Sequence, residues 1–110
     1  MSVDVGAQMR KGVVEYCVLG LLARQPMYGW ELSDALTGAG LIASIGTLYP
    51  LLGRLRDNGW VATFDQPSDA GPVRKYYRLT DAGIAQLAHF RAQWTPFARI
   101  VTGIVGEEPS

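Results

Sequence analysis

A nearly continuous run of apolar residues lies in the first third of the chain, and its β-branched residues would suit a strand, but its length and placement favour a helix. A strongly apolar segment over residues 9–24 predicts a mostly buried helix that Pro26 ends, with residues 1–8 as a loose arm before it. A second helix is expected over residues 28–37. Its apolar contacts would come from Trp30, Leu32 and Leu36.

The next helix carries its apolar residues on one side only. Ser44 is placed to cap its start, and the pair Asn58-Gly59 ends it. Four leucines lie at i, i+3, i+4 and i+7 and predict a buried stripe: Leu48, Leu51, Leu52 and Leu55. The opposite side is built from small or short residues, Gly46, Pro50, Gly53 and Asp57. Such a face can lie close to another surface, and the alternative is an ordinary solvated helix.

The pattern then changes to that of a hairpin. Residues 60–66 and 73–79 predict two strands around a turn-rich loop over residues 67–72. Strand alternation places three residues on one face of the second strand, Arg74, Tyr76 and Arg78. Basic residues there can reach phosphates of a nucleic acid, or they can simply protect an edge strand from aggregation.

A last helix is expected to begin at Thr80, which would cap it. Its apolar residues follow heptad spacing: Leu87, Phe90, Trp94, Phe97, Val101 and Ile104. Pro96 should kink or break the helix near residues 92–95. A seam this apolar predicts a homodimer interface on a chain of this size.

Composition narrows the class of protein. A chain of 110 residues predicts one domain, or one domain plus an appended element, and ten basic residues balance ten acidic ones. One cysteine, Cys17, and one histidine, His89, argue against a disulfide, a metal site and a Ser-His catalytic pair, and no cofactor motif is present. Neither a leader nor a membrane-spanning run is visible, which predicts a soluble, cytoplasmic protein. Because no nucleophile–base pair, metal set or phosphate loop is visible either, we expect that it is not an enzyme.

Three motifs closely resemble those of PadR-family transcriptional regulators over roughly residues 12–95. The first is Met27-Tyr-Gly-Trp-Glu-Leu32, and the second is Gly46-Thr-Leu-Tyr-Pro50 followed by Arg54-Leu55 and Asn58-Gly59. The third is Arg74-Lys-Tyr-Tyr-Arg-Leu-Thr80 with Gly83. The short C-terminal part is similar to the compact subfamily with a single C-terminal helix.

The resemblance implies an α+β, mainly helical fold. Residues 1–79 would form a winged helix-turn-helix domain, and residues 80–110 a dimerisation helix and tail. The implied function is that of a homodimeric repressor, which binds double-stranded operator DNA and releases it on binding a small molecule. The implied DNA contacts fall on Tyr28, Ser44, Thr47, Tyr49, Arg54, Arg74, Lys75 and Tyr76.

The resemblance also implies an effector site between two subunits. Symmetry would bring two copies of Trp94 together, and two indoles can sandwich a planar aromatic molecule. The residues around that space would be Met9, Gly12, Tyr16, Leu87, Arg91, Trp94 and Ala98. Arg91 departs from the apolar lining of drug sensors and favours an anionic aromatic ligand if it points inward.

Three alternatives stay open. Trp94 at a heptad position can be packing alone, and Cys17 in an apolar helix can be inert packing or, as a lesser possibility, a redox sensor. The neutral net charge also fits a winged-helix module that binds proteins without touching DNA. The salt dependence of binding to promoter DNA would distinguish a DNA-binding regulator from this protein-binding module.

Overall fold

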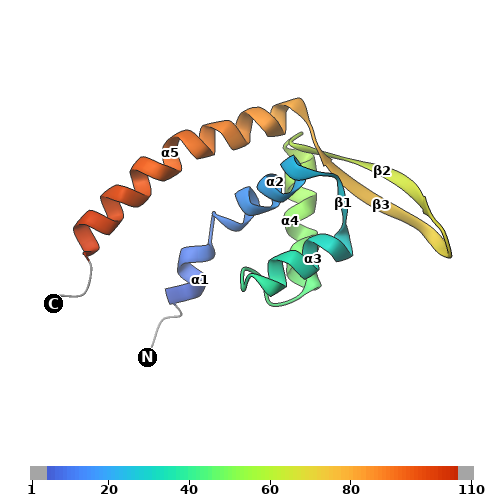
Figure 1. Cartoon of the computed structure of the whole chain (residues 1–110), viewed down its shortest axis with the longest axis horizontal. Coiled ribbons are helices and arrows are strands. Elements are labelled where there is room, and N and C mark those ends of the chain that lie inside the picture. The colour runs from blue at the N-terminus through green and yellow to red at the C-terminus, as the bar shows by residue number, and fades with distance from the viewer. Residues whose placement is uncertain (1–4, 107–110) are drawn as a thin grey trace.

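A computed structural model describes residues 5–106 of the chain, and it is mainly helical with one small sheet (Figure 1). The expected α+β winged helix with a C-terminal helix is confirmed. The elements in order are α1 (Val5–Arg10), α2 (Val14–Arg24), β1 (Met27–Tyr28), α3 (Gly29–Gly38), α4 (Ile45–Asp57), β2 (Val61–Ser68), β3 (Gly71–Leu79) and α5 (Asp81–Val105).

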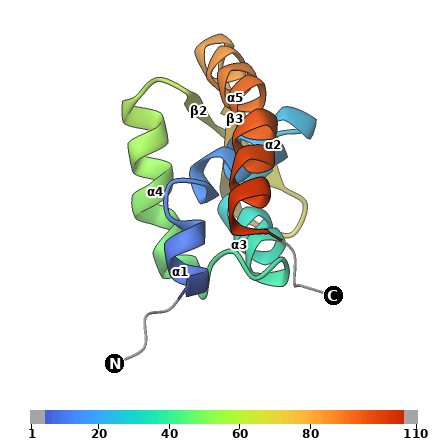
Figure 2. The same cartoon turned by 90° about the vertical axis from the view of Figure 1, so that its left-hand side faces the viewer.

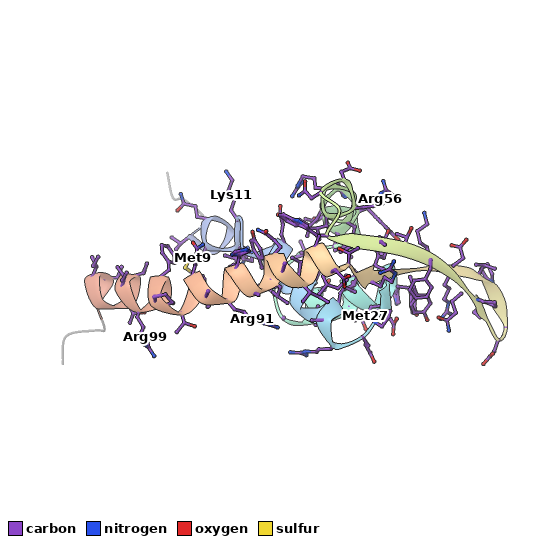
Figure 3. All side chains as sticks on the ribbon, turned by 90° about the horizontal axis from the view of Figure 1, so that it is seen from above. Met9, Lys11, Met27, Arg56, Arg91 and Arg99 are labelled. Carbon is purple, nitrogen blue, oxygen red and sulfur yellow. The ribbon has the colours of Figure 1, made fainter. Side chains whose placement is uncertain are left out.

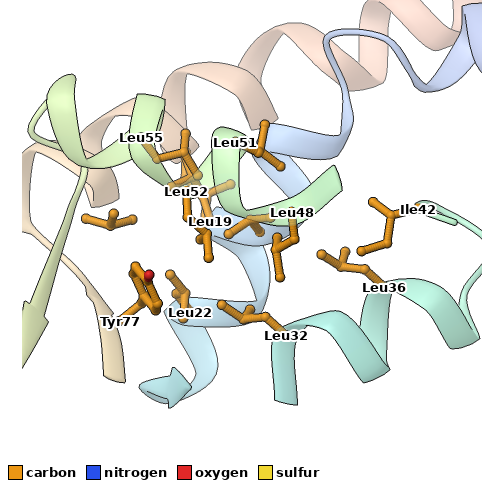
Figure 4. Close-up of a cluster of buried hydrophobic side chains, with 13 residues drawn as sticks. Leu19, Leu22, Leu32, Leu36, Ile42, Leu48, Leu51, Leu52, Leu55 and Tyr77 are labelled. Carbon is orange, nitrogen blue, oxygen red and sulfur yellow. The ribbon is translucent and has the colours of Figure 1, made fainter. Parts of the chain in front are cut away.

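The core lies where α2, α3 and α4 meet the base of the sheet (Figure 4). The predicted leucine stripe of α4 is confirmed, since Leu48, Leu51, Leu52 and Leu55 are all buried. They pack with residues of the other elements, namely Val18, Leu19, Leu22, Leu32, Leu36, Ile42, Val61, Tyr77 and Leu87. This cluster fixes the orientation of α4, so its opposite face is held outward.

The N-terminal segment differs from the single helix predicted over residues 9–24. Gly12 has φ +83, a left-handed conformation that breaks the segment into α1 and α2. Residues 5–8, expected in a loose arm, belong to α1, while residues 1–4 of that arm lie outside the described part of the chain. The apolar pattern could not reveal the break, because it depends on the backbone of one glycine.

The sheet has the order β1-β3-β2, with both pairs antiparallel. Its first strand, β1, is a two-residue strand that the sequence pattern did not predict. The hairpin of β2 and β3, called the wing below, is longer than expected, because Ser68 pairs with Gly71. The loop predicted over residues 67–72 is therefore wrong for most of its length, since only Asp69 and Ala70 lie between the strands.

Helix α5 is joined to the wing by a compact junction. The Thr80 hydroxyl accepts from the Gly83 N–H at 3.0 Å, which confirms the predicted cap, and donates to the Gly59 carbonyl at 2.7 Å. Of the kink or break predicted at Pro96, the break does not occur, because α5 runs to Val105 as one curved helix (Figures 1 and 2). Pro96 is exposed, so water can bind the carbonyl that its missing N–H leaves free.

Candidate nucleic-acid interface

The outward face of α4 carries several of the residues expected to contact DNA. Ser44 occupies the N-cap position with extended backbone, although its hydroxyl makes no capping hydrogen bond. Thr47 and Tyr49 are exposed in the first half of the helix, and the Tyr49 side chain is 53% exposed. The buried leucines turn the small residues Gly46 and Pro50 away from the core, and Thr47 and Tyr49 flank that outward face on either edge. Helix α4 thus presents a short polar and aromatic surface.

The wing presents its basic residues on both faces. Tyr77 is buried, which confirms the predicted alternation and places Arg74, Tyr76 and Arg78 on the opposite face. Arg74 and Lys75 are exposed beyond the part of the hairpin that covers the core. Gln66 is paired with Arg74, and Asp65 is paired with Lys75. Arg74 and Lys75 thus lie in the half of the wing nearer its tip, whereas Arg78, which is paired with Ala62, lies near its base.

A stack of side chains attaches the wing to the start of α3. The Arg74 guanidinium lies over the Tyr28 ring, 4.7 Å from its centroid. The Tyr28 ring is 5.5 Å from that of Tyr76, and Tyr76 lies 5.6 Å from Phe64. The Tyr28 N–H donates to the Glu31 carboxylate at 3.1 Å, which fixes the first turn of α3. This arrangement orients Arg74 before any ligand binds.

The start of α3 also contributes a residue that the sequence pattern misplaced. Trp30, predicted to supply a core contact, is 60% exposed, because the core side of α3 is filled by Leu32 and Leu36. A shallow groove brings Trp30 beside Tyr49, Arg74 and other residues of the same surface. Tyr49 packs closely on Gly29, where a Cβ would lie 3.1 Å from the Tyr49 hydroxyl. Only the position of Trp30 around the helix, relative to Leu32 and Leu36, could have predicted that Trp30 is exposed beside Tyr49.

The electrostatic surroundings of Tyr77 connect the same elements. Burial raises the pKa of the Tyr77 hydroxyl above its ordinary value, and Tyr49 raises it further, while Arg56 lowers it. Tyr77 therefore stays neutral at physiological pH.

Arg54 lies at the other edge of α4. Its guanidinium donates to the Glu15 carboxylate at 3.1 Å, and the two side chains are 60% and 26% exposed. Apart from Ser44 at the N-cap of α4, the residues expected to contact DNA thus fall into two groups. Tyr28, Tyr49, Arg74, Lys75 and Tyr76 gather around the wing side of α4, whereas Thr47 and Arg54 line a groove toward α2.

The residues expected around an effector are only partly brought together. The Tyr16 ring stacks on Phe90 at 4.3 Å and 9°, and Phe90 lies 5.5 Å from Trp94. Gln86 donates to the Tyr16 hydroxyl at 3.1 Å. Leu87 is buried in the core below this ladder of rings. The aromatic ladder is therefore formed within one chain.

The remaining members of that set lie apart. Met9 is 69% exposed on α1, and Gly12 forms the turn after it. Ala98 lines a shallow groove on α5 beside Trp94, and Arg91 lines a different groove with Cys17, between α2, α3 and α5. Burial raises the pKa of the Cys17 thiol. The Trp94 ring lies 5.5 Å from that of Phe90 and 6.4 Å from that of Phe97, and Trp94 is 41% exposed in a single chain.

The heptad seam of α5 divides into two halves. Leu87 is buried and Phe90 is half-buried against α2, so the first half packs within the chain. Phe97, Val101 and Ile104 are 58%, 40% and 81% exposed. Figure 1 shows this second half extending beyond the body formed by α2, α3 and α4. In a single chain these apolar side chains are therefore left in contact with water.

Within residues 5–106, no group of three or more His, Cys, Asp or Glu side chains is placed to hold a metal ion. None of the helices described there has the length and apolar character needed to cross a bilayer.

Comparisons with known proteins agree with this geometry. The model of the transcriptional regulator PadR-like family matches residues 18–89. The transcriptional regulator Rv3488 of Mycobacterium tuberculosis is 33% identical over 96 residues, which cover 87% of this chain and 89% of that protein.

Solved structures have the same architecture over nearly the whole chain. A PadR-like transcriptional regulator from Bacillus cereus superposes with a TM-score of 0.83 at 37% identity, covering 92% of this chain and 99% of that one. A Streptococcus transcriptional regulator gives 0.81 at 39% identity, with coverage of 90% and 98%.

Proposed function

Because this chain belongs to the PadR-like family of transcriptional regulators, we propose that it is a homodimeric repressor that releases operator DNA when a small molecule binds. The single observation that carries the DNA-binding part is the surface shared by α4 and the wing. There, Tyr49 is exposed on the helix that follows α3, and Arg74 is held over Tyr28.

Helix α4 fits the role of a recognition helix. An α-helix can enter the major groove, and the small outward residues Gly46 and Pro50 would let its backbone approach the bases closely. Tyr49 and Thr47 would then reach base edges or phosphates, and Arg74 and Lys75 would reach the flanking backbone. Few side chains are available for hydrogen bonds to bases, so groove shape should carry part of the sequence preference.

The homodimer is supported by the exposed second half of α5. Two copies of the Phe97, Val101 and Ile104 surface would bury each other about a two-fold axis. The dimer would space two wings for two half-sites of an operator.

The effector is supported by the partial exposure of Trp94. In such a dimer, its partly exposed ring would meet that of the partner, and a flat aromatic molecule could insert between them. A ligand that fits one angle between the subunits better than another would shift the dimer toward a state that binds DNA less well.

The decisive experiment measures binding to a duplex that carries the DNA upstream of the protein's own coding sequence. We expect the affinity to fall steeply with salt, because the protein displaces counterions from phosphates. Tyr49→Ala should weaken binding, while Tyr49→Phe, which keeps the ring against Gly29, reports on the hydroxyl alone. Circular dichroism of both variants should match that of the unmodified protein.

A second candidate function is suggested by the neutral net charge, which lacks the cationic excess of many DNA-binding domains. In that case, the same surface would bind a protein. Absent or salt-independent DNA binding would favour this protein-interaction module over the repressor.

A further inference from the structure

A groove of about 590 Å³ lies on the edge of α4 that faces away from the wing. It is bounded by the turn between α1 and α2, the connection between α3 and α4, and the first turns of α4. Its cationic residues are Arg10, Lys11 and Arg54, and Glu15 is the one acidic residue in its lining. The lining therefore carries a net charge of about +2 in a protein whose total charge is zero.

The turn at Gly12 creates this concentration of charge. Because Gly12 is left-handed, α1 does not continue along the axis of α2, and the residues before the turn, Arg10 and Lys11, lie beside α4. Figure 3 shows Lys11 and Arg56 projecting to the same side of the molecule, while Arg99 projects to the opposite side. Lys11 thus shares the side of the molecule on which α4 lies.

The two edges of α4 carry different neighbours. Tyr49 lies toward the wing with Arg74 and Lys75, while Thr47 and Arg54 lie toward the groove. A helix in a major groove has one phosphate backbone on each side. The wing can account for only one of them, so the other would meet the edge that carries Arg10 and Lys11.

We propose that this groove is a second phosphate-binding surface, which contacts the DNA backbone on the opposite side of α4 from the wing. The inference rests on the proposed DNA-binding function and adds Arg10 and Lys11 to the residues that carry it. Both residues belong to the segment before α2. Their side chains therefore contact the DNA backbone without taking up positions on the recognition helix α4.

Glu15 gives the proposal a test of opposite sign. Its carboxylate holds Arg54 at 3.1 Å and places a negative charge in the groove. An approaching phosphate must compete with this carboxylate for Arg54 and is repelled by it. Glu15→Gln should therefore raise DNA affinity, whereas removal of the neighbouring cations should lower it.

The experiment uses the full chain and the duplex described above. In the double variant Arg10→Gln and Lys11→Gln, the negative slope of log affinity against log salt should become less steep. Its magnitude should fall by roughly 1.8 per protomer bound, at about 0.9 for each phosphate that is no longer neutralised. Arg24→Gln is the matched control, because Arg24 is exposed on the groove between α2, α3 and α5. Its salt slope should equal that of the unmodified protein.

Ethylation interference locates the bound phosphates on the DNA. The double variant should lose sensitivity at phosphates on one side of the major groove, and Arg74→Ala should lose it at the other side. A double variant with the slope of Arg24→Gln would overturn this inference while leaving DNA binding through the wing intact. If the unmodified protein binds no duplex, the DNA-binding function itself is wrong, and the second surface is excluded with it.

Discussion

The Arg74 guanidinium lies 4.7 Å from the centroid of the Tyr28 ring. This contact joins the half of the wing nearer its tip to the N-terminus of α3. A guanidinium stacked on a ring keeps its N–H donors free at the edge of the plane. Arg74 can therefore be oriented by Tyr28 and still bind a phosphate. The contact connects the stability of the wing to the geometry of the proposed DNA surface.

The first prediction separates the ring of Tyr28 from its hydroxyl. Tyr28→Leu should weaken DNA binding by about 0.5–1 kcal/mol, the usual contribution of an exposed cation–π contact, because Arg74 loses its support. Tyr28→Phe keeps that support and should bind nearly as well as the unmodified protein. Fluorescence anisotropy with a labelled duplex measures both. Equal losses in the two variants would instead assign the effect to the hydroxyl.

The second prediction concerns the junction of α5. A Cβ on Gly83 would collide with the Trp60 carbonyl oxygen and the Leu79 side chain. Gly83→Ala should therefore lower the free energy of unfolding by about 1–3 kcal/mol, the range for overpacking. Gly20→Ala is the control, since a Cβ on Gly20 in α2 meets no atom within 4 Å. It should be neutral or stabilising, and urea unfolding compares the two.

The third prediction concerns Cys17. Burial raises its pKa above the ordinary value of 9.0, so at pH 8 the folded protein should react with iodoacetamide more slowly than the urea-unfolded chain. A raised folded pKa also means that the thiol contributes stability that is lost as the pH rises through the ordinary value toward the folded one. Cys17→Ala should reduce this alkaline loss. Fast alkylation of the folded protein would favour the redox-sensor alternative.

The sequence pattern correctly predicts the elements in which buried residues recur at a regular spacing. The leucine stripe of α4 and the alternation around Tyr77 were both correct, because burial on one side imposes a regular spacing. The break at Gly12 was missed, since a single left-handed glycine leaves the apolar pattern unchanged. Trp30 was misplaced in the core, because hydrophobicity alone does not specify which side of a helix is buried.

The candidate site was predictable to a smaller extent. The residue types of α4 and the wing indicated a DNA surface, but the stacking of Arg74 on Tyr28 joins positions far apart in the sequence. The groove near Arg10 and Lys11 was also invisible, because it depends on how the turn at Gly12 places α1 beside α4. Such contacts follow from tertiary packing, which one sequence does not encode in any local pattern.

The fourth prediction tests the dimer. Phe97 and Ile104 are exposed on the second half of α5, and a charge at either site should oppose burial against a partner. Phe97→Asp and Ile104→Asp should each weaken dimerisation by at least about 1.5 kcal/mol, since burial of such a side chain contributes about 1.5–3 kcal/mol. Sedimentation equilibrium measures the dissociation constant.

Ala92→Asp is the control for that prediction. Ala92 is exposed on the opposite face of α5 by the helical period, so the same charge should leave dimerisation unchanged. A monomeric unmodified protein at micromolar concentration would contradict the homodimer and, with it, the shared effector site. Equal weakening by all three variants would show that charge, not the Phe97 and Ile104 surface, governs association.

The last prediction concerns the effector. Trp94 lies 5.5 Å from Phe90 and 6.4 Å from Phe97 within its own chain, yet it is 41% exposed, so part of the indole is accessible to a ligand. A planar aromatic compound should quench tryptophan fluorescence and lower operator affinity in the unmodified protein. The fall in affinity is limited by the difference in ligand affinity between the two dimer states.

Trp94→Ala should abolish this response and still give a folded dimer that binds operator, because Leu87 and Phe90 retain the packing of α5 on α2. It also controls for fluorescence from Trp30 and Trp60. If an anionic ligand is preferred, Arg91→Gln should weaken its binding more than that of a neutral analogue. Unfolding or dissociation of the Trp94→Ala variant would show that the indole serves packing instead. An absence of quenching by planar compounds would argue against the pocket, since a half-exposed indole in an aromatic ladder should report any stacked ligand.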